Sequence, residues 1–375
     1  MLKNRLKIFT ILGFNIYIDL SWLILAVLIV WSLSAGYFPE KIKNLHGYAY
    51  IIMGIFGAFG LFFSIVFHEL SHSVFARSYG VKMNGITLFL FGGVAEMENE
   101  PEKPMAEFVM GIMGPVSSVV LAGIFALISR LFYAELPAPV YIVLQYLSWI
   151  NLLLAAFNMI PAFPLDGGRV LRSIIWAFNK NVFSATRISS KFGETFGWFL
   201  MIGGGLLFMG TSNPGYIWYF VIGFFLRNAA ISSYENVVLK KLLSGVKVSE
   251  FLKRDVETVD SSVTVNDFVE NHVYKHLHRI FPVIVNGKLT GCADSDVLGN
   301  IAREKWKGLT VKDIQHKCIP ENTIAPEAPA LEAFSRMSAG GFNSLMVTQN
   351  DILLGMVRMA DIAKYIALKA RIEKI

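Results

Sequence analysis

The sequence Phe67-His68-Glu69-Leu70-Ser71-His72 lies inside a long apolar segment, Ile51–Ala76. Such a segment predicts a helix that crosses a membrane, because roughly 20 apolar residues are needed to span about 30 Å of hydrocarbon. Residues four apart project from one face of a helix, so His68 and His72 can present both imidazoles to one metal ion. Ionisable residues at this depth usually mark function. The stretch therefore predicts a metal site inside a membrane protein.

Glu69 is adjacent to His68 and cannot easily bind the same ion. It is instead placed to take a proton from water at the metal. With 7 His in 375 residues, a chance HExxH pattern has odds below about one in a hundred. The alternative is a set of polar residues that hydrogen-bond to one another within a helix bundle.

The composition agrees with a membrane protein. Hydrophobic residues make up 54% of the chain and charged residues 17%, which is too apolar for an ordinary soluble enzyme. The long apolar runs stop near Tyr234, and the charge density of a soluble domain follows. Six segments are candidate spans, of which the fifth is short and rich in glycine: Ile18–Ala35, Ile51–Ala76, Phe108–Phe132, Val140–Ile160, Thr195–Met209 and Ile217–Ile231.

The lysines and arginines between these segments predict the orientation. They are frequent before the first span and after the second, fourth and sixth spans, and scarce in the other connections. Cytoplasmic loops carry the excess of Lys and Arg, so both termini are expected in the cytoplasm of a multi-pass protein of the cell membrane. The net charge of +6 follows from this membrane pattern, and we expect no nucleic-acid partner.

A second motif, Asn158-Met159-Ile160-Pro161-Ala162-Phe163-Pro164-Leu165-Asp166-Gly167-Gly168-Arg169, ends the fourth span. Its two prolines stop the helix, so Asp166 is expected on an irregular segment that lines a cavity. The second and fourth spans both run inward, which brings Asp166 to the depth of the two histidines. Catalytic zinc usually has three protein ligands, and Asp166 can supply the third. Taken alone, Asp166 also suits the N-cap of a following helix.

Together, HELSH and NMIPAFPLDGG resemble the site-2 protease family of intramembrane zinc metalloproteases, and the resemblance covers roughly residues 1–235. It implies that His68, His72 and Asp166 bind one Zn²⁺ per chain and that Glu69 is the general base. It further implies that Asn158 positions the substrate or stabilises the oxyanion. Ser71 departs from the glycine of many members, but it is also small.

Residues between Gly85 and Met97 read as a short hairpin or re-entrant strand, because Thr and aromatic residues are bounded by glycines. A helical substrate must unwind before hydrolysis, and an edge strand can hold the unwound segment by β-augmentation. A purely structural hairpin that fills the bundle is the equal alternative.

From about Lys247 the chain carries two similar units, each a helix, two strands and a closing helix. They resemble tandem cystathionine-β-synthase-type (CBS) domains, which implies an adenine-nucleotide site and a homodimer formed through the tail. The match is loose, because Asp294 and Arg358 stand where a small hydroxylated residue is expected. A ligand-free dimerisation or docking module stays open. The expected domains are residues 1–235, a linker at 236–246, and the tail at 247–375 with units at about 247–306 and 307–375.

The fold class is thus expected to be a polytopic α-helical membrane protein, with six transmembrane helices and a short β-hairpin, plus a cytosolic α/β tandem CBS domain. The expected activity is hydrolysis of peptide bonds in transmembrane protein substrates near the cytoplasmic face. A channel or transporter with a regulatory tail would use the same residues as an ion path, and a catalytically silent scaffold that binds membrane partners is a further alternative.

Overall fold

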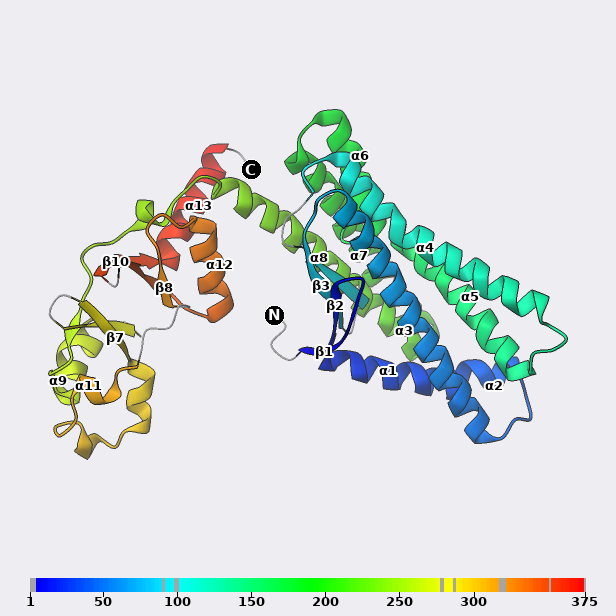
Figure 1. The fold of residues 1–375 in the computed structure, drawn as a ribbon, viewed down its shortest axis with the longest axis horizontal. Helices are drawn as coiled ribbons and strands as arrows, with labels where there is room; N and C mark the ends of the chain where they lie inside the picture. The colour runs from blue at the N-terminus through cyan, green and yellow to red at the C-terminus, as the bar shows by residue number, and fades with distance from the viewer. Residues whose placement is uncertain are drawn as a thin grey trace. The chain divides into compact units, whose positions relative to one another are not determined.

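The computed structural model of the chain describes residues 5–89, 92–97, 101–276, 280–285, 288–316, 322–350 and 352–373. The chain divides into two compact units, Met1–Val237 and Val238–Ile375. The first unit is mainly helical, and the second is built from short helices and two small sheets (Figure 1).

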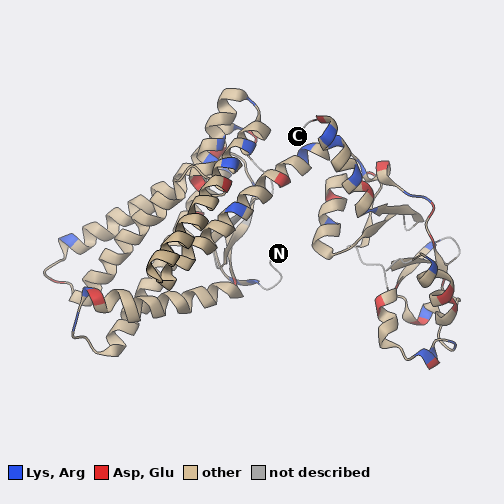
Figure 2. Cartoon of the chain, turned by 180° about the vertical axis from the view of Figure 1, so that it is seen from behind, with Lys and Arg blue, Asp and Glu red and all other residues tan. Residues whose placement is uncertain are grey.

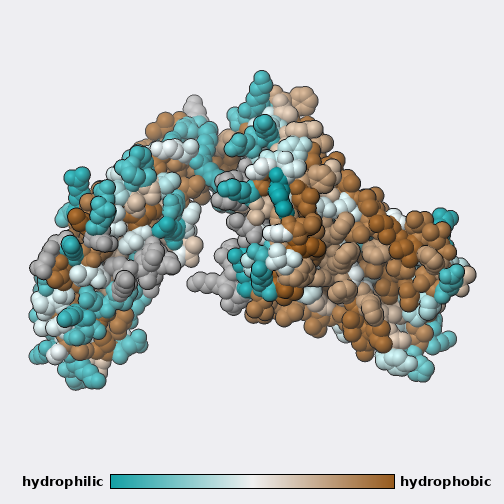
Figure 3. All heavy atoms as spheres, viewed as in Figure 1, coloured by the Kyte–Doolittle hydropathy of each residue, from teal (hydrophilic) through white to brown (hydrophobic). Residues whose placement is uncertain are grey.

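Within the described residues, five helical segments of the first unit are long and apolar enough to cross a membrane. Apolar side chains cover the surface over these helices (Figure 3), and the middle of α4 and α5 carries few charged residues (Figure 2). The segments are α1 with α2 (Leu20–Lys41), α3 (Gly47–Ser78), α4 (Pro104–Leu131), α5 (Ala138–Asn158) and α7 (Val182–Thr211).

The helices α3, α4 and α5 pack closely because small residues lie between them. A Cβ atom added at Gly60 of α3 would lie 2.6 Å from the side chain of Leu147 of α5. One turn further along α3, Ser64 accepts a hydrogen bond of 2.9 Å from the Asn151 amide of α5. Small residues let helix backbones approach in a membrane, and polar side chains then bond across the interface. These contacts with α5 set the rotation of α3 about its own axis, and with it the residues of α3 that face α4.

A four-stranded sheet lies beside these helices, in the order β1-β2-β3-β4. The hairpin expected between Gly85 and Met97 is present as β3 (Met83–Phe89) and β4 (Gly92–Met97), which pair antiparallel. The sheet is larger than expected, because β1 (Arg5–Ile11) and β2 (Phe14–Asp19) precede α1, and β2 pairs parallel with β3. The first helix consequently begins at Leu20, where Asp19 accepts a hydrogen bond from the Ser21 amide as the N-cap.

Two helical boundaries differ from the sequence-based expectation. The helix α7 begins at Val182, well before the expected Thr195. Its first half is polar, so a search for apolar segments does not include it, although it belongs to the same helix. Asp166 was expected on an irregular segment, but it is the first residue of α6 (Asp166–Asn179), with Leu165 at the N-cap. The prolines do interrupt the chain, since α5 ends at Asn158 and α6 starts only at Asp166. The sixth expected span falls within α8 (Ile217–Leu242).

The second unit contains two three-stranded sheets of the same topology, β5-β6-β7 and β8-β9-β10. In each, the first strand is parallel to the second and the second is antiparallel to the third. The bounds are β5 (Val259–Asp260), β6 (Ile280–Val285), β7 (Lys288–Asp294), β8 (Thr323–Ile324), β9 (Ser344–Gln349) and β10 (Ile352–Arg358). The helices are α9 (Val265–Phe268), α10 (Tyr274–His276), α11 (Val311–Ile314), α12 (Ala330–Gly340) and α13 (Met359–Glu373).

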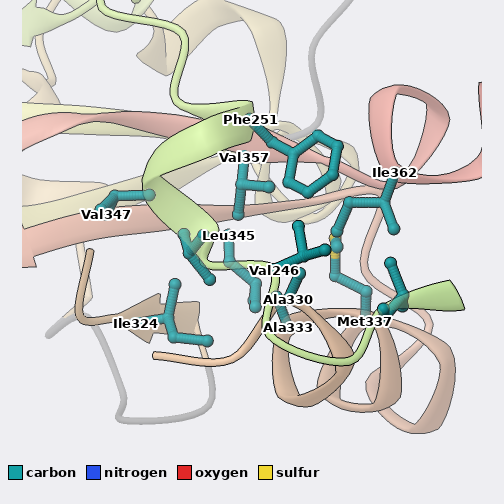
Figure 4. Close-up of a cluster of buried hydrophobic side chains, with 12 residues drawn as sticks. Val246, Phe251, Ile324, Ala330, Ala333, Met337, Leu345, Val347, Val357 and Ile362 are labelled. Atoms are coloured by element: carbon teal, nitrogen blue, oxygen red, sulfur yellow. The ribbon is translucent and has the colours of Figure 1, made fainter. Parts of the chain in front are cut away.

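The core of the second repeat joins its sheet to α12 and α13. Leu345, Val347 and Val357 from the strands pack with Met337 of α12 and Ile362 of α13 (Figure 4). The first repeat ends differently. Its last strand, β7, is followed by a 3₁₀ segment, Ser295–Asn300, whereas β10 of the second repeat is followed by the long helix α13.

Candidate metal centre

His68 and His72 lie one turn apart near the C-terminal end of α3, and their imidazoles face the start of α6. The Nε2 atoms of His68 and His72 lie 3.0 Å and 3.2 Å from the same carboxylate oxygen, Oδ2 of Asp166. Both histidines are buried, with 3% and 9% of their surface exposed. The ligand atoms of the three residues all lie within 4.8 Å of one another. Two distant segments thus converge as the sequence predicts.

The other ring nitrogen of each histidine is held by α4. Nδ1 of His68 lies 2.9 Å from the hydroxyl oxygen of Ser118, and Nδ1 of His72 donates to the carbonyl oxygen of Met110 at 2.5 Å. Metal-ligating histidines almost always use the second nitrogen in this way, which fixes the tautomer and the ring orientation. The Nε2 atoms are in this way directed at the space beside Asp166, and for His72 the carbonyl acceptor places the proton on Nδ1.

Small residues on α4 make this close approach possible. A Cβ atom at Gly114 would lie 2.6 Å from Nε2 of His68, and one at Gly111 would lie 3.2 Å from the backbone oxygen of Asp166. Gly111, Gly114, Pro115 and Ser118 are spaced i, i+3, i+4 and i+7, which places them on one helix face. Sequence reasoning missed Ser118 and this face, and the small-residue spacing is the signal that could have found them.

Glycines and an ion pair set the position of Asp166. A Cβ atom at Gly168 would lie 2.6 Å from the carbonyl carbon of Ala162, so only glycine fits where α6 turns back on the preceding loop. Arg172 of α6 forms a buried ion pair with Glu107 of α4, and its guanidinium lies 5.1 Å from the ring centre of Phe163. Through these contacts of Arg172, α6 and the loop that precedes it pack against α4.

Glu69 lies against the edge of the sheet. It is partly buried, and a Cβ atom at Gly93 of β4 would lie 3.0 Å from Oε1 of Glu69. The carboxylate therefore approaches the backbone of β4 at a position where a larger residue would displace it. Asn158 is the last residue of α5 and is partly buried. Its role stays a prediction.

The three residues fit a catalytic zinc ion. Two imidazole nitrogens and one carboxylate oxygen form a three-ligand set of the kind that leaves a fourth position open. The buried Nε2 atoms meet a single oxygen, and both Nδ1 atoms are already engaged. Zinc at such a site supplies Lewis acidity, which makes water more acidic and polarises a peptide carbonyl.

The HExxH motif lies on a helix that is long enough to cross a membrane, and a later helix supplies the third candidate metal ligand. This combination of fold and site defines a membrane metalloprotease. The model of peptidase family M50 matches residues 56–201, and that of the CBS domain matches residues 311–368. The chain belongs to peptidase family M50, the site-2 proteases. It is a zinc metalloprotease with a C-terminal CBS domain.

Comparison with individual proteins gives the following similarities. Rip3 of Mycobacterium tuberculosis is 30% identical over 97% of this chain and 93% of its own length. Zinc metalloprotease MJ0392 of Methanocaldococcus jannaschii is 29% identical over 82% of this chain and 84% of its own. The solved site-2 protease from Methanocaldococcus jannaschii covers 61% of this chain and 95% of its own, at 29% identity and a TM-score of 0.43.

We expect Ser118→Ala to weaken zinc binding about 10- to 100-fold, because the His68 ring loses the partner that holds its orientation. Competition with a zinc chelator on purified protein measures the change. Ser129→Ala is the matched control, since its hydroxyl donates to the backbone of its own helix at Ala126. Equal affinities of Ser118→Ala and Ser129→Ala would contradict the role of Ser118.

We expect Arg172→Met to destabilise the protein by about 3–5 kcal/mol, because it leaves the Glu107 carboxylate charged in a buried position. Arg172 and Glu107 are only 6% and 2% exposed. Denaturant unfolding in detergent measures the loss. Arg169→Met on the same helix is the control, since Arg169 is less buried, and an equal loss in both variants would argue against the ion pair as the cause.

Proposed function

We propose that this chain is an intramembrane protease that hydrolyses peptide bonds of membrane-spanning proteins near the cytoplasmic face. The observation that carries the proposal is the meeting of His68, His72 and Asp166 within a bundle of apolar helices. His68 follows the start of α3 by about 30 Å of helix rise. A site at that depth lies near one surface of the membrane, where a spanning segment can be reached without leaving the bilayer.

In this proposal, His68, His72 and Asp166 hold the zinc ion, and Glu69 is the general base. Its carboxylate accepts a proton from the attacking water and passes it to the leaving amine. Asn158 is proposed to hold the substrate or its oxyanion. The position of Glu69 one residue after His68, on the adjoining side of α3, supports a role in proton transfer rather than in metal binding.

We propose that the substrate enters as an added strand beside β4. The sheet order places β4 at one end, and Gly93 of β4 lies against Glu69. A segment paired with β4 would have its backbone extended, as hydrolysis requires, and would pass close to Glu69. The contact between Gly93 of β4 and the Glu69 carboxylate favours substrate binding by β4 over a purely structural role for the hairpin.

The proposed topology has six crossings, formed by α1 with α2, α3, α4, α5, α7 and α8. Both termini are then cytoplasmic in a multi-pass protein of the cell membrane. The distribution of Lys and Arg between the spans supports this orientation. We propose that residues 1–235 carry catalysis and that the tail at 247–375 is cytosolic and regulates it.

For the tail, we propose homodimer formation and docking rather than nucleotide binding. A cavity of about 110 Å³ is lined by residues of both repeats, among them Glu257, Ser344 and Arg358. This volume is well below the roughly 300–1,000 Å³ of ordinary ligand pockets. Calorimetric titration of the full-length protein with ATP and AMP tests the choice, because measurable heat would favour a nucleotide site.

Comparative membrane proteomics tests the proposed activity. Cells that carry Glu69→Gln should accumulate full-length membrane substrates that the wild-type protein removes. Candidate substrates by analogy are membrane-tethered transcription regulators, anti-sigma factors and remnant signal peptides. Identical membrane proteomes, together with zinc-dependent cleavage of a soluble protein, would place the activity outside the membrane. Ion flux through liposomes without proteolysis would favour a channel.

A further inference from the structure

A second cavity lies at the end of the helices that is remote from the metal centre. It has a volume of about 830 Å³ and is lined by the end of α2 and the π-helical turn before it, the end of α4 and the start of α5. Arg130 lines it and follows Ser118 by about 18 Å of rise along α4. The cavity is therefore separate from the site of peptide hydrolysis.

The lining of this cavity is positively charged. Lys41 and Arg130 both contribute to it, and none of the described lining residues is Asp or Glu. The Lys41 ammonium lies 5.6 Å from the ring centre of Tyr37, which also lines the cavity. Two cations that line one cavity attract an anionic group, and the phosphates of lipid headgroups are anions that lie at the ends of membrane-spanning helices.

Polarity changes along the cavity. Tyr141, Gln145 and Leu152 line it from α5, and their spacing of four and then seven residues keeps them on one helix face. They span about 16 Å from the start of α5 towards its middle. The outer end offers a phenol and an amide, whereas the inner end offers Leu152 and, from α4, Ala126. This gradient matches an amphiphile with a polar head and an apolar chain.

Hydrogen bonding at the outer end leaves a donor for such a head. Gln145 donates from Nε2 to the Tyr141 hydroxyl oxygen at 2.5 Å, and a hydroxyl that accepts still has its own proton to donate. By contrast, the Ser129 and Ser148 hydroxyls both donate to backbone carbonyl oxygens, at Ala126 and Ala122. The Tyr141 phenol and the cations of Lys41 and Arg130 are thus among the lining groups that can donate to an anionic head.

Two aromatic residues of the cavity lining are largely exposed on the surface of the first unit. Trp149 and Tyr133 line the cavity, and 62% and 65% of their respective surfaces are exposed on the first unit. Aromatic residues of this type gather where the hydrocarbon meets the headgroups. A soluble anion would need no apolar arm along Ala126 and Leu152.

We propose that this cavity binds an anionic phospholipid, with its phosphate at the end formed by Lys41 and Arg130. One acyl chain lies along Ala126 and Leu152. Charge complementarity and the polarity gradient favour this occupant over the acidic flank of a protein substrate. The site is independent of the proposed peptide hydrolysis.

Native mass spectrometry of the full-length protein in detergent tests the proposal. The probes are phosphatidylglycerol and phosphatidylcholine with identical acyl chains. The wild-type protein should retain phosphatidylglycerol preferentially, and Lys41→Gln or Arg130→Gln should each reduce the preference about fivefold, the effect of one interfacial cation. Ala126→Phe should reduce retention of both lipids, because it fills the apolar arm. Unfolding temperatures without added lipid verify that each variant is folded.

Lys43→Gln is the matched control, since Lys43 lies two residues from Lys41 but does not line the cavity. It should behave as the wild-type protein. Unchanged lipid preference in Lys41→Gln and Arg130→Gln, or an equal loss in Lys43→Gln, would overturn the proposal. So would displacement of the lipid by millimolar glycerol phosphate, which would assign the site to a free anion. Equal retention of both lipids, with a raised KM for acidic substrates in the two variants, would assign it to substrate.

Discussion

Glu69→Gln is expected to retain zinc at the wild-type level and to lower the rate of peptide hydrolysis by about 10²–10⁴-fold, the usual contribution of a general acid–base group. Glutamine has almost the shape of glutamate but cannot accept the proton of the attacking water. The proposed ligands, His68, His72 and Asp166, are untouched by this change. Zinc content by elemental analysis and cleavage of a membrane substrate, measured on the same preparation, separate the two effects.

The control for this variant is Glu235→Gln, which makes the same chemical change at an exposed position of α8. It should cleave at the wild-type rate. Normal cleavage by Glu69→Gln would remove Glu69 from the mechanism. Loss of zinc from Glu69→Gln would instead show that the carboxylate contributes to the metal site.

Asp166→Ala and His68→Ala are expected to lower bound zinc from about one ion per chain to a small fraction, because two protein ligands remain where catalytic sites use three. Cleavage should fall with zinc content. The measurement is again elemental analysis of protein purified without added metal, followed by titration with zinc. Recovery of activity only at high zinc concentration would agree with weakened binding.

Asn158→Ala provides the matched control at the other end of the same motif. Because Asn158 is proposed to contact substrate, its variant should keep zinc and change only kcat or KM. If Asp166→Ala and His68→Ala kept their zinc, the proposed ligand set would be wrong. If Asn158→Ala lost zinc, its role would be structural or metal-binding.

The sequence predicted the meeting of the metal-site residues because membrane topology constrains depth. If the two spans run in the same direction, the HExxH motif and Asp166 are expected at matching depth without knowledge of side-chain packing; their lateral approach was inferred from the ligand types and from the family resemblance. The contacts of the histidine Nδ1 atoms were not predictable in this way. Whether Ser118 or a neighbouring residue reaches His68 depends on the rotation of α4 about its own axis, which span counting leaves undetermined.

The sheet illustrates the same limit. The hairpin between Gly85 and Met97 was predicted from its glycines and aromatic residues, since its signal is local. The strands β1 and β2 were missed, because the first span was expected to begin at Ile18 and no element was assigned to the residues before it. β1 and β2 form a local antiparallel hairpin, but β2 also pairs with β3, about 70 residues further along the chain, and local composition carries no information about such a distant pairing.

The helix α4 contacts all three residues of the metal centre, through Met110, Gly111 and Ser118. The histidines belong to α3 and Asp166 to α6, so α4 is the element that holds the two ligand-bearing helices in one arrangement. Enlarging a small residue on this face of α4 is consequently expected to disturb the ligand set as a whole rather than a single ligand.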